Sequence, residues 1–368
     1  MASRSPLPSG HVPGLDGIRA FAICLVLLSH SVIFGQFSSL RLVGLGGGYV
    51  GVAVFFVMSG YLITTLLLKE EDRTGGISLR AFYLRRALRL FPALWLYLLV
   101  VGAFCLAGQL PNHPWHSFVA SLLYVRNFIG RGNETDHLWS LSIEEQFYLL
   151  WPVILVYLAR RNSTRLGVAL SGIAAVTAWR LLAANAGLAS AGALYIRSDF
   201  RFDAPLFGCA LALAIKVAPQ LVNWSNSTPL RSSLLAAAGA TGLIVWVVFR
   251  LGEKVYPGSG DTFVYLLSLM LLLSQVGVRR SPGWFAWGPL VKLGQISYGV
   301  YLWQQFFLGP RVAPFYTVRT FPIGLLATLA VAATSYWLLE RPLLRLKDRI
   351  QLNHDRLSEG QNTNAASQ

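Results

Sequence analysis

The chain has 368 residues, of which 54% are hydrophobic and 13% are charged, and its mean hydropathy is +0.53. Because soluble domains carry roughly 25% charged residues, this composition excludes an ordinary soluble domain and predicts a polytopic membrane protein. The formal net charge of +15 does not indicate nucleic acid as a partner, because the lysines and arginines are scattered between apolar runs, as membrane anchors are.

Ten apolar segments predict an all-α bundle of about ten transmembrane helices. The predicted spans are 15–35, 48–68, 90–108, 138–158, 166–186, 203–218, 231–250, 262–278, 291–308 and 322–340. Ten spans place both termini on one side. The excess of basic residues there predicts the cytoplasmic side of the inner or plasma membrane.

The rest of the chain fits one membrane domain. We expect residues 1–14 to be a short cytoplasmic leader, residues 15–346 to be the transmembrane domain and residues 347–368 to be a polar, disordered tail. The segment Trp115–Phe128 is apolar but too short to cross a bilayer, so it predicts an interfacial or re-entrant helix on the outer side.

The three cysteines, Cys24, Cys105 and Cys209, lie far apart in apolar segments. Neither a disulfide framework nor a CxxC metal site is therefore predicted, and no metal ion is expected.

The first span carries Arg19 near its start and His30 near its end. Eleven residues at roughly 100° each make about three turns, so both side chains should point to one face about 16 Å apart. Ionisable groups inside a bilayer are rare, and a neutral imidazole accepts protons, so His30 is a candidate base. The alternative is a histidine that only binds a neighbouring carbonyl.

The span at 138–158 presents a polar face. Glu144 should lie at a depth comparable with that of His30, so we expect the two to pair, with the carboxylate supporting the imidazole as a general base. Glu145 points about 100° away. The alternative is that Glu144 and Glu145 only join helices, for example by binding Arg201. Spacings of three and four place four side chains on this face: His137, Ser140, Glu144 and Tyr148.

A basic cluster precedes Phe91. It contains Arg85, Arg86 and Arg89, with Arg19 at a similar depth on the cytoplasmic side. Guanidinium groups bind phosphate bidentately and stay charged, so the four arginines predict a site for a phosphorylated anion. The alternative is that they are topological anchors.

Other polar groups are weaker candidates. Tyr298, Tyr301 and Gln304 share a helical face and could bind a hydroxylated substrate, or belong to an aromatic belt. Arg201 and Asp203 could bind a polar substrate or only each other.

Two further segments favour structural roles. The small residues at the ends of Gly51–Gly60 predict close helix packing. Glu340 and Arg341, at the end of the last span, predict a local ion pair.

Six stretches follow one another between Leu15 and about Leu346: LDGIRAFAICLVLLSH, GVAVFFVMSGYLI, RRALRLFPALW, HLWSLSIEEQFYLLWP, ISYGVYLW and LLERPL. In these stretches the chain resembles the membrane-bound acyltransferase 3 family, integral-membrane O-acyltransferases that modify surface polysaccharides and some macrolides. The resemblance implies a ten-helix bundle with acyl-coenzyme A on the cytoplasmic side. It also implies a glycan or small hydroxylated acceptor on the far side, the lipid bilayer as surroundings, and glycan-assembly proteins as partners.

The family's functional residues fall on matching positions. Its arginine-to-histidine pair falls on Arg19 and His30, its arginine pair on Arg86 and Arg89, and its glutamate on Glu144. Two departures stand out. Gln304 occupies a position where members often carry histidine, and many members have an extracytoplasmic hydrolase-like domain where this sequence has a short polar segment.

The resulting hypothesis is transfer of an acyl group, most simply acetyl, from acyl-coenzyme A to a hydroxyl of a sugar, glycan or lipid-linked precursor. His30 would act as base or acyl acceptor, Glu144 would orient it, and the arginines would hold the coenzyme phosphates. One alternative is a proton-coupled transporter or flippase, although no inverted repeat is evident. Another is a scaffold that binds a glycan or lipid without turnover. Release of free coenzyme A separates an enzyme from both.

Overall fold

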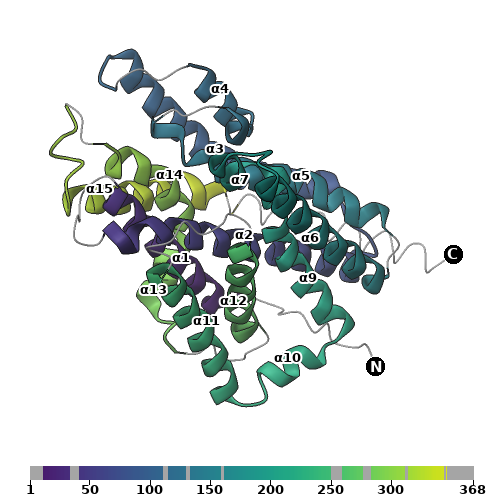
Figure 1. Ribbon diagram of the computed structural model, residues 1–368. Coiled ribbons are helices and arrows are strands. Elements are labelled where there is room, and N and C mark those ends of the chain that lie inside the picture. The colour runs from purple at the N-terminus through teal and green to yellow at the C-terminus, as the bar shows by residue number, and fades with distance from the viewer. Residues whose placement is uncertain are drawn as a thin grey trace.

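The computed structural model describes residues 11–33, 41–110, 115–129, 133–158, 161–249, 259–276, 283–310, 314–343 and 345. Within these ranges every regular element is helical (Figure 1). The α-helices are α1 Pro13–Ile33, α2 Arg41–Thr74, α3 Leu79–Leu106, α4 Trp115–Leu122, α5 Leu138–Tyr157, α6 Asn162–Asn185, α7 Ala191–Ile196, α8 Ser198–Arg201, α9 Asp203–Val217, α10 Gln220–Ser225, α11 Pro229–Phe249, α12 Ser259–Gln275, α13 Gly288–Gln295, α14 Ser297–Leu308 and α15 Ile323–Ser335. A π-helical turn, Tyr336–Glu340, continues α15.

Six helices in the described ranges are long and apolar enough to cross a membrane: 13–33, 46–74, 79–106, 162–185, 229–249 and 323–343. They make the chain a multi-pass membrane protein, as the composition predicts. The other four predicted spans correspond to α5, α9, α12 and the α13–α14 pair. These helices are shorter or, in the case of α5, more polar than the six.

Two predicted elements are interrupted. The span predicted at 291–308 is divided at Ile296, where α13 ends and α14 begins. Just before this junction Gly294 brings α13 into backbone contact with α1, since a Cβ there would lie 1.9 Å from the carbonyl oxygen of Asp16. The predicted interfacial helix over Trp115–Phe128 ends at Leu122, because Tyr124 adopts a left-handed conformation with φ 53°.

Helix α2 is the centre of the bundle. It packs against α1, α9, α11, α12 and α5 (Figure 1). The predicted packing role of its glycines is confirmed. A Cβ on Gly51 would lie 2.5 Å from the carbonyl oxygen of Ala22, and one on Gly60 would lie 1.8 Å from that of Pro205. Because α2 has no side chain at these points, the backbones of α1 and α9 can approach it closely.

Helix α3 begins eleven residues earlier than the span predicted from residue 90, at Leu79. The side chain of Ser78 accepts a hydrogen bond from the Ala81 amide at 3.3 Å, which caps the helix. Glu70 of α2 in turn accepts a hydrogen bond from the Ser78 amide at 2.9 Å. The basic cluster therefore lies within α3, with its orientation fixed by the helix.

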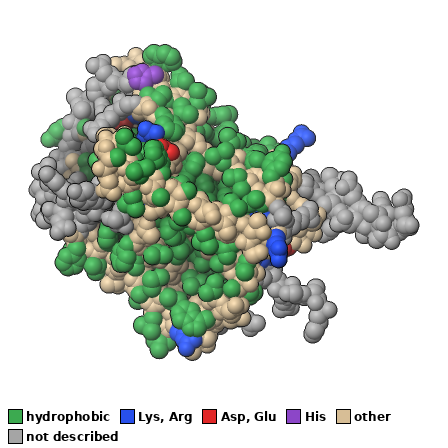
Figure 2. Space-filling view, turned by 45° about the vertical axis from the view of Figure 1, so that its right-hand side comes forward, with side chains coloured by type: hydrophobic (Ala, Val, Ile, Leu, Met, Phe, Trp, Pro, Cys, Tyr) green, Lys and Arg blue, Asp and Glu red, His purple; other side chains and the backbone are tan. Residues whose placement is uncertain are grey.

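The outer surface is apolar. Figure 2 shows one face over which hydrophobic side chains are widely spread and charged groups are few. Leu106 and Tyr157, for example, are 93% and 84% exposed. Apolar exposure on this scale suits contact with lipid rather than water.

Candidate active site

A cavity of about 200 Å³ opens between α1, α2, α3, α5 and α14. One wall, from α2, is apolar and includes Phe55, Phe56, Met58 and Leu62. The opposite walls are polar. They bring together nine residues that the sequence predicted as site residues: Arg19, Arg85, Arg86, Arg89, Ser140, Glu144, Tyr148, Tyr298 and Tyr301. Polar lining residues that the sequence did not identify as a site are Ser59, Gln295, Ser297, Tyr336 and Glu340.

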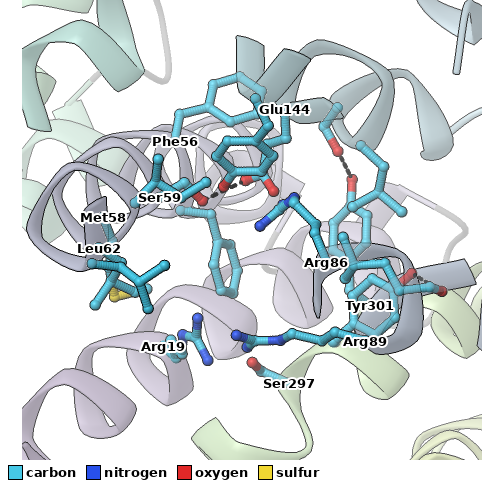
Figure 3. A pocket seen from close by; sticks show the side chains of 18 of the residues that line it. Arg19, Phe56, Met58, Ser59, Leu62, Arg86, Arg89, Glu144, Ser297 and Tyr301 are labelled. Atoms are coloured by element: carbon cyan, nitrogen blue, oxygen red, sulfur yellow. Dashed lines mark hydrogen bonds between the residues drawn. The ribbon is translucent and has the colours of Figure 1, made fainter. Parts of the chain in front are cut away.

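Arg19 and Arg89 form the most unusual feature of this cavity. Their guanidinium groups come from α1 and α3 and point toward one another (Figure 3), close enough for mutual repulsion. Among the described residues no carboxylate lies within 4.0 Å of either group, and neither makes a hydrogen bond. Two unpaired like charges in a cavity inside a membrane protein disfavour the empty site and favour a bound anion.

Arg85 and Arg86 differ from that pair because each already has a carboxylate partner. Arg85 donates to Glu70 at 2.7 Å. Arg86 donates to both oxygens of Glu145, at 2.8 Å to the nearer one, and lies 3.3 Å above the ring of Tyr148. Within the described residues, two of the four predicted arginines, Arg85 and Arg86, are neutralised by ion pairs. The other two have no carboxylate within 4.0 Å among these residues, although the more distant Glu340 attracts Arg89.

The predicted helical face of α5 is confirmed for three of its four members. Ser140, Glu144 and Tyr148 all line the cavity, and Glu145 points elsewhere, toward Arg86. Glu144 accepts a hydrogen bond from Ser59 of α2 at 3.0 Å (Figure 3).

The hydrogen-bond partner of Glu144 is thus Ser59, and not His30 as expected. The sequence places Glu144 on the correct face, but it carries no information about which neighbouring helix that face meets.

His30 lies beyond the end of the cavity, in a second polar layer. Its Nδ1 lies 2.9 Å from Oε1 of Gln304, on α14. The layers are separated by Tyr301, whose hydroxyl hydrogen-bonds to Ser140 at 2.5 Å and donates to the His137 carbonyl at 2.8 Å. The ring of His137 packs against that of Tyr301 and lies within electrostatic range of His30. Arg19 lines the cavity and His30 does not, although both come from α1.

Tyr298 and Tyr301 of the predicted polar face on α14 line the cavity, and Gln304 continues that face into the second layer. The hydroxyl of Tyr298 donates to the carbonyl of Leu90 on α3 at 2.9 Å. These contacts join α14 to α3 and α5 around the cavity.

Arg201 and Asp203 lie away from the cavity, in a buried cluster of ion pairs. Asp203 pairs with Arg180 at 2.6 Å, and Asp261 lies 3.3 Å from both Arg180 and Arg201. All four side chains are at most 7% exposed. Arg201 is therefore bound by Asp261 and not by Asp203 or Glu144, and the cluster joins α6, α8, α9 and α12 instead of facing a substrate.

The predicted local pair of Glu340 and Arg341 is replaced by other contacts. Glu340 is buried, lines the cavity and accepts a 3.4 Å hydrogen bond from Ser335. Arg341 instead lies 4.1 Å above the ring of Trp337. The π-helical turn rotates Glu340 inward relative to an α-helix, which explains why helical periodicity did not identify it.

Comparisons with known proteins give a consistent result. A family model described as an acyltransferase domain matches residues 12–339. The chain is 31% identical over 361 residues to a Staphylococcus aureus (strain COL) protein named as a proposed O-acetyltransferase. It is 30% identical over 358 residues to the O-acetyltransferase OatA of Staphylococcus aureus (strain NCTC 8325). Each match covers 90% of this chain and 57% of the relative. No solved structure matches the chain.

Proposed function

This chain belongs to the acyltransferase family whose model matches residues 12–339, and from that membership we propose that it is a membrane O-acyltransferase. The donor is acyl-coenzyme A, most simply acetyl-coenzyme A. The acceptor is a hydroxyl of a sugar, glycan or lipid-linked precursor. The chain spans about 57% of the length of the curated relatives that it matches, one of which is named an O-acetyltransferase.

The observation that carries the proposal is that Arg19 and Arg89 face one another in the cavity with no carboxylate within 4.0 Å among the described residues. Coenzyme A carries several phosphate groups, and a guanidinium fork matches phosphate geometry in two parallel hydrogen bonds. A phosphate between the two groups would replace their mutual repulsion by two attractions. In this proposal the arginine end of the cavity opens to the cytosol.

The remaining walls suit the rest of the donor. The apolar wall of α2 offers a surface for the extended arm of the coenzyme, while Ser59 and Glu144 offer hydrogen-bond acceptors for its amide groups. Glu144 then orients the donor arm instead of the imidazole. The thioester would reach the end of the cavity at Ser140 and Tyr301, next to the layer that contains His30.

In the proposed reaction His30 is the general base. The acceptor hydroxyl oxygen attacks the thioester carbonyl carbon, so that a C–O bond forms and the C–S bond breaks. The imidazole accepts the hydroxyl proton and returns it to the departing thiolate, which leaves as the coenzyme A thiol. A positioned general base contributes a factor of about 100 to 10,000 in rate.

The test is replacement of His30 by alanine. Membranes containing wild-type protein, His30→Ala or His116→Ala are incubated with labelled acetyl-coenzyme A and cell-envelope acceptors, and both labelled product and free coenzyme A are measured. His116 is an exposed histidine on α4 and serves as the matched control. We expect His30→Ala to lose transfer by at least about 100-fold and His116→Ala to retain it.

Two outcomes would contradict the proposal. Unchanged transfer by His30→Ala would remove His30 from the reaction. Absence of coenzyme A release by the wild-type protein, with every acceptor fraction, would favour a transporter or scaffold over an enzyme.

A further inference from the structure

We propose that Gln304 is the positioning residue of His30: its side-chain carbonyl holds the imidazole in the tautomer protonated at Nδ1, so that Nε2 is the nitrogen that accepts the proton. This inference rests on the proposed function, because it assigns the orienting group for the same base. It replaces the carboxylate that the sequence predicted for that role with a neutral amide.

With the Gln304 amide oriented as in this structure, the contact assigns the tautomer. Nδ1 of His30 lies 2.9 Å from Oε1 of Gln304. A carbonyl oxygen has lone pairs and no proton, so the imidazole nitrogen must be the donor in this hydrogen bond. A neutral imidazole has one protonated nitrogen and one with a free lone pair. Protonation at Nδ1 therefore leaves the lone pair at Nε2, on the opposite edge of the ring.

Gln304 is held by burial and by its helix, and its amide nitrogen makes no hydrogen bond within the described residues. Its residue is fully buried, on α14, which packs against α1. The same helix bears Tyr301 three residues earlier, and that side chain is fixed by Ser140 and by the carbonyl of His137. Consecutive turns of one helix thus fix the end of the cavity and the imidazole beyond it.

One other acceptor reaches the ring, because the backbone carbonyl of Val26, one turn earlier on α1, also hydrogen-bonds to the His30 imidazole. The carboxylate that the sequence predicted does not. Glu144 is bound to Ser59 and lies in the cavity layer. The other imidazole nearby, that of His137, has no side chain hydrogen-bonded to either ring nitrogen in the described structure. Of the two histidines, His30 is the one that the structure supplies with a side-chain acceptor.

An amide orients the ring without adding a charge. A carboxylate in this place would bring a formal negative charge into a buried layer, at a considerable desolvation cost. The amide provides the same acceptor geometry at a lower cost. It stabilises the imidazolium less than a carboxylate would, which suits a base that holds the proton only until the thiolate leaves.

The experiment compares three variants that differ in what they present to Nδ1. Gln304→Met keeps an unbranched side chain of similar length but has no comparable acceptor. Gln304→Glu keeps the acceptor and has no amide donor. Gln305→Met makes the same change at the next residue, which is also buried, and serves as the matched control. For each protein, kcat, the KM for acetyl-coenzyme A and the melting temperature in detergent are measured.

We expect Gln304→Met to lower kcat about 100-fold with an unchanged donor KM and with a melting temperature close to that of Gln305→Met. This is less than the roughly 10,000-fold loss that a wrong tautomer causes in a serine protease triad, because methionine leaves the imidazole free to adopt either tautomer. Gln304→Glu should keep kcat within about tenfold of wild type, and Gln305→Met should match wild type.

The inference is overturned if Gln304→Met retains the wild-type kcat, or if folded Gln304→Glu is as slow as Gln304→Met. The second result would mean that Gln304 acts as a donor. If Gln304→Glu fails to fold, the kcat of Gln304→Met relative to that of Gln305→Met is sufficient to test the inference. The same assay also tests the proposed function, which holds if the wild-type protein transfers the acyl group and His30→Ala does not. Failure of the proposed function can therefore be told apart from failure of the inference about Gln304.

Discussion

Replacing Arg89 by methionine should weaken donor binding without loosening the fold. Most of the buried or half-buried arginines that the structure describes are paired with a carboxylate, and removing one leaves an uncompensated charge. Arg89 has no such partner within 4.0 Å among the described residues and faces Arg19 instead. Its removal therefore breaks no ion pair and relieves a repulsion.

The size of the binding effect follows from the contact that is lost. A hydrogen bond to a charged group contributes about 1.5–3 kcal/mol. At about 1.4 kcal/mol for each factor of ten, Arg89→Met should weaken acetyl-coenzyme A binding by about 10- to 150-fold. Arg86→Met provides the contrast. It leaves Glu145 without its cation and should destabilise the fold by about 3 kcal/mol, near the lower end for buried pairs because both side chains keep about 15% exposure.

The assay is equilibrium binding of labelled acetyl-coenzyme A to purified protein, with thermal melting of the same samples. Arg80→Met is the matched control, because Arg80 is an exposed arginine on the same helix and does not line the cavity. We expect Arg80→Met to bind the donor as wild type does. Donor binding unchanged in Arg89→Met, or a melting temperature that falls as far as in Arg86→Met, would refute the reasoning.

Two further predictions concern stability, measured as the melting temperature in detergent. Gly60→Val should destabilise the protein by about 3 kcal/mol or more, because a Cβ there would lie 1.8 Å from the backbone of α9. Gly167→Val, at a helical position with open space around it, should have little effect. Equal melting temperatures of the two variants would contradict the packing argument. Asp203→Asn should cost about 3–5 kcal/mol of stability, because it leaves Arg180 buried without its carboxylate. Asp199→Asn, in an exposed pair, should change stability by less than about 1 kcal/mol. Similar losses would mean that ion pairing does not stabilise the buried cluster around Asp203.

Features that depend on one helix could be predicted from the sequence. Spacings of three and four placed Ser140, Glu144 and Tyr148 on one face, and all three line the cavity. Small residues at Gly51 and Gly60 marked points of close approach, and both meet neighbouring backbones. These predictions succeeded because the pitch of a helix and the absence of a side chain are local properties.

Features that depend on two helices could not be predicted in the same way. His30 meets Gln304 and Glu144 meets Ser59, because the rotation and depth of each helix relative to its neighbours are set by packing across the bundle. The ion pair of Asp261 could not be predicted for the same reason, since its partner Arg180 is far away in the chain. Depth estimated from residue counts placed the imidazole and the carboxylate at one level, whereas the structure places them in successive layers.

The layered arrangement gives the helices themselves a role in the proposed reaction. Three helices each contribute to both layers: α1 through Arg19 and His30, α5 through Ser140 and the carbonyl of His137, and α14 through Tyr301 and Gln304 (the cavity residues are drawn in Figure 3). The α5 and α14 pairs are three residues apart, so the end of the cavity and the imidazole layer are separated by about 4.5 Å along the helices, a little less than one turn. The eleven residues from Arg19 to His30 set about 16 Å between the phosphate-binding end and the base. A donor held by its phosphates at one end can then react only if its arm is long enough to bring the thioester to the other. The distance along α1 would therefore select for an acyl group on a long carrier over a small free acyl donor.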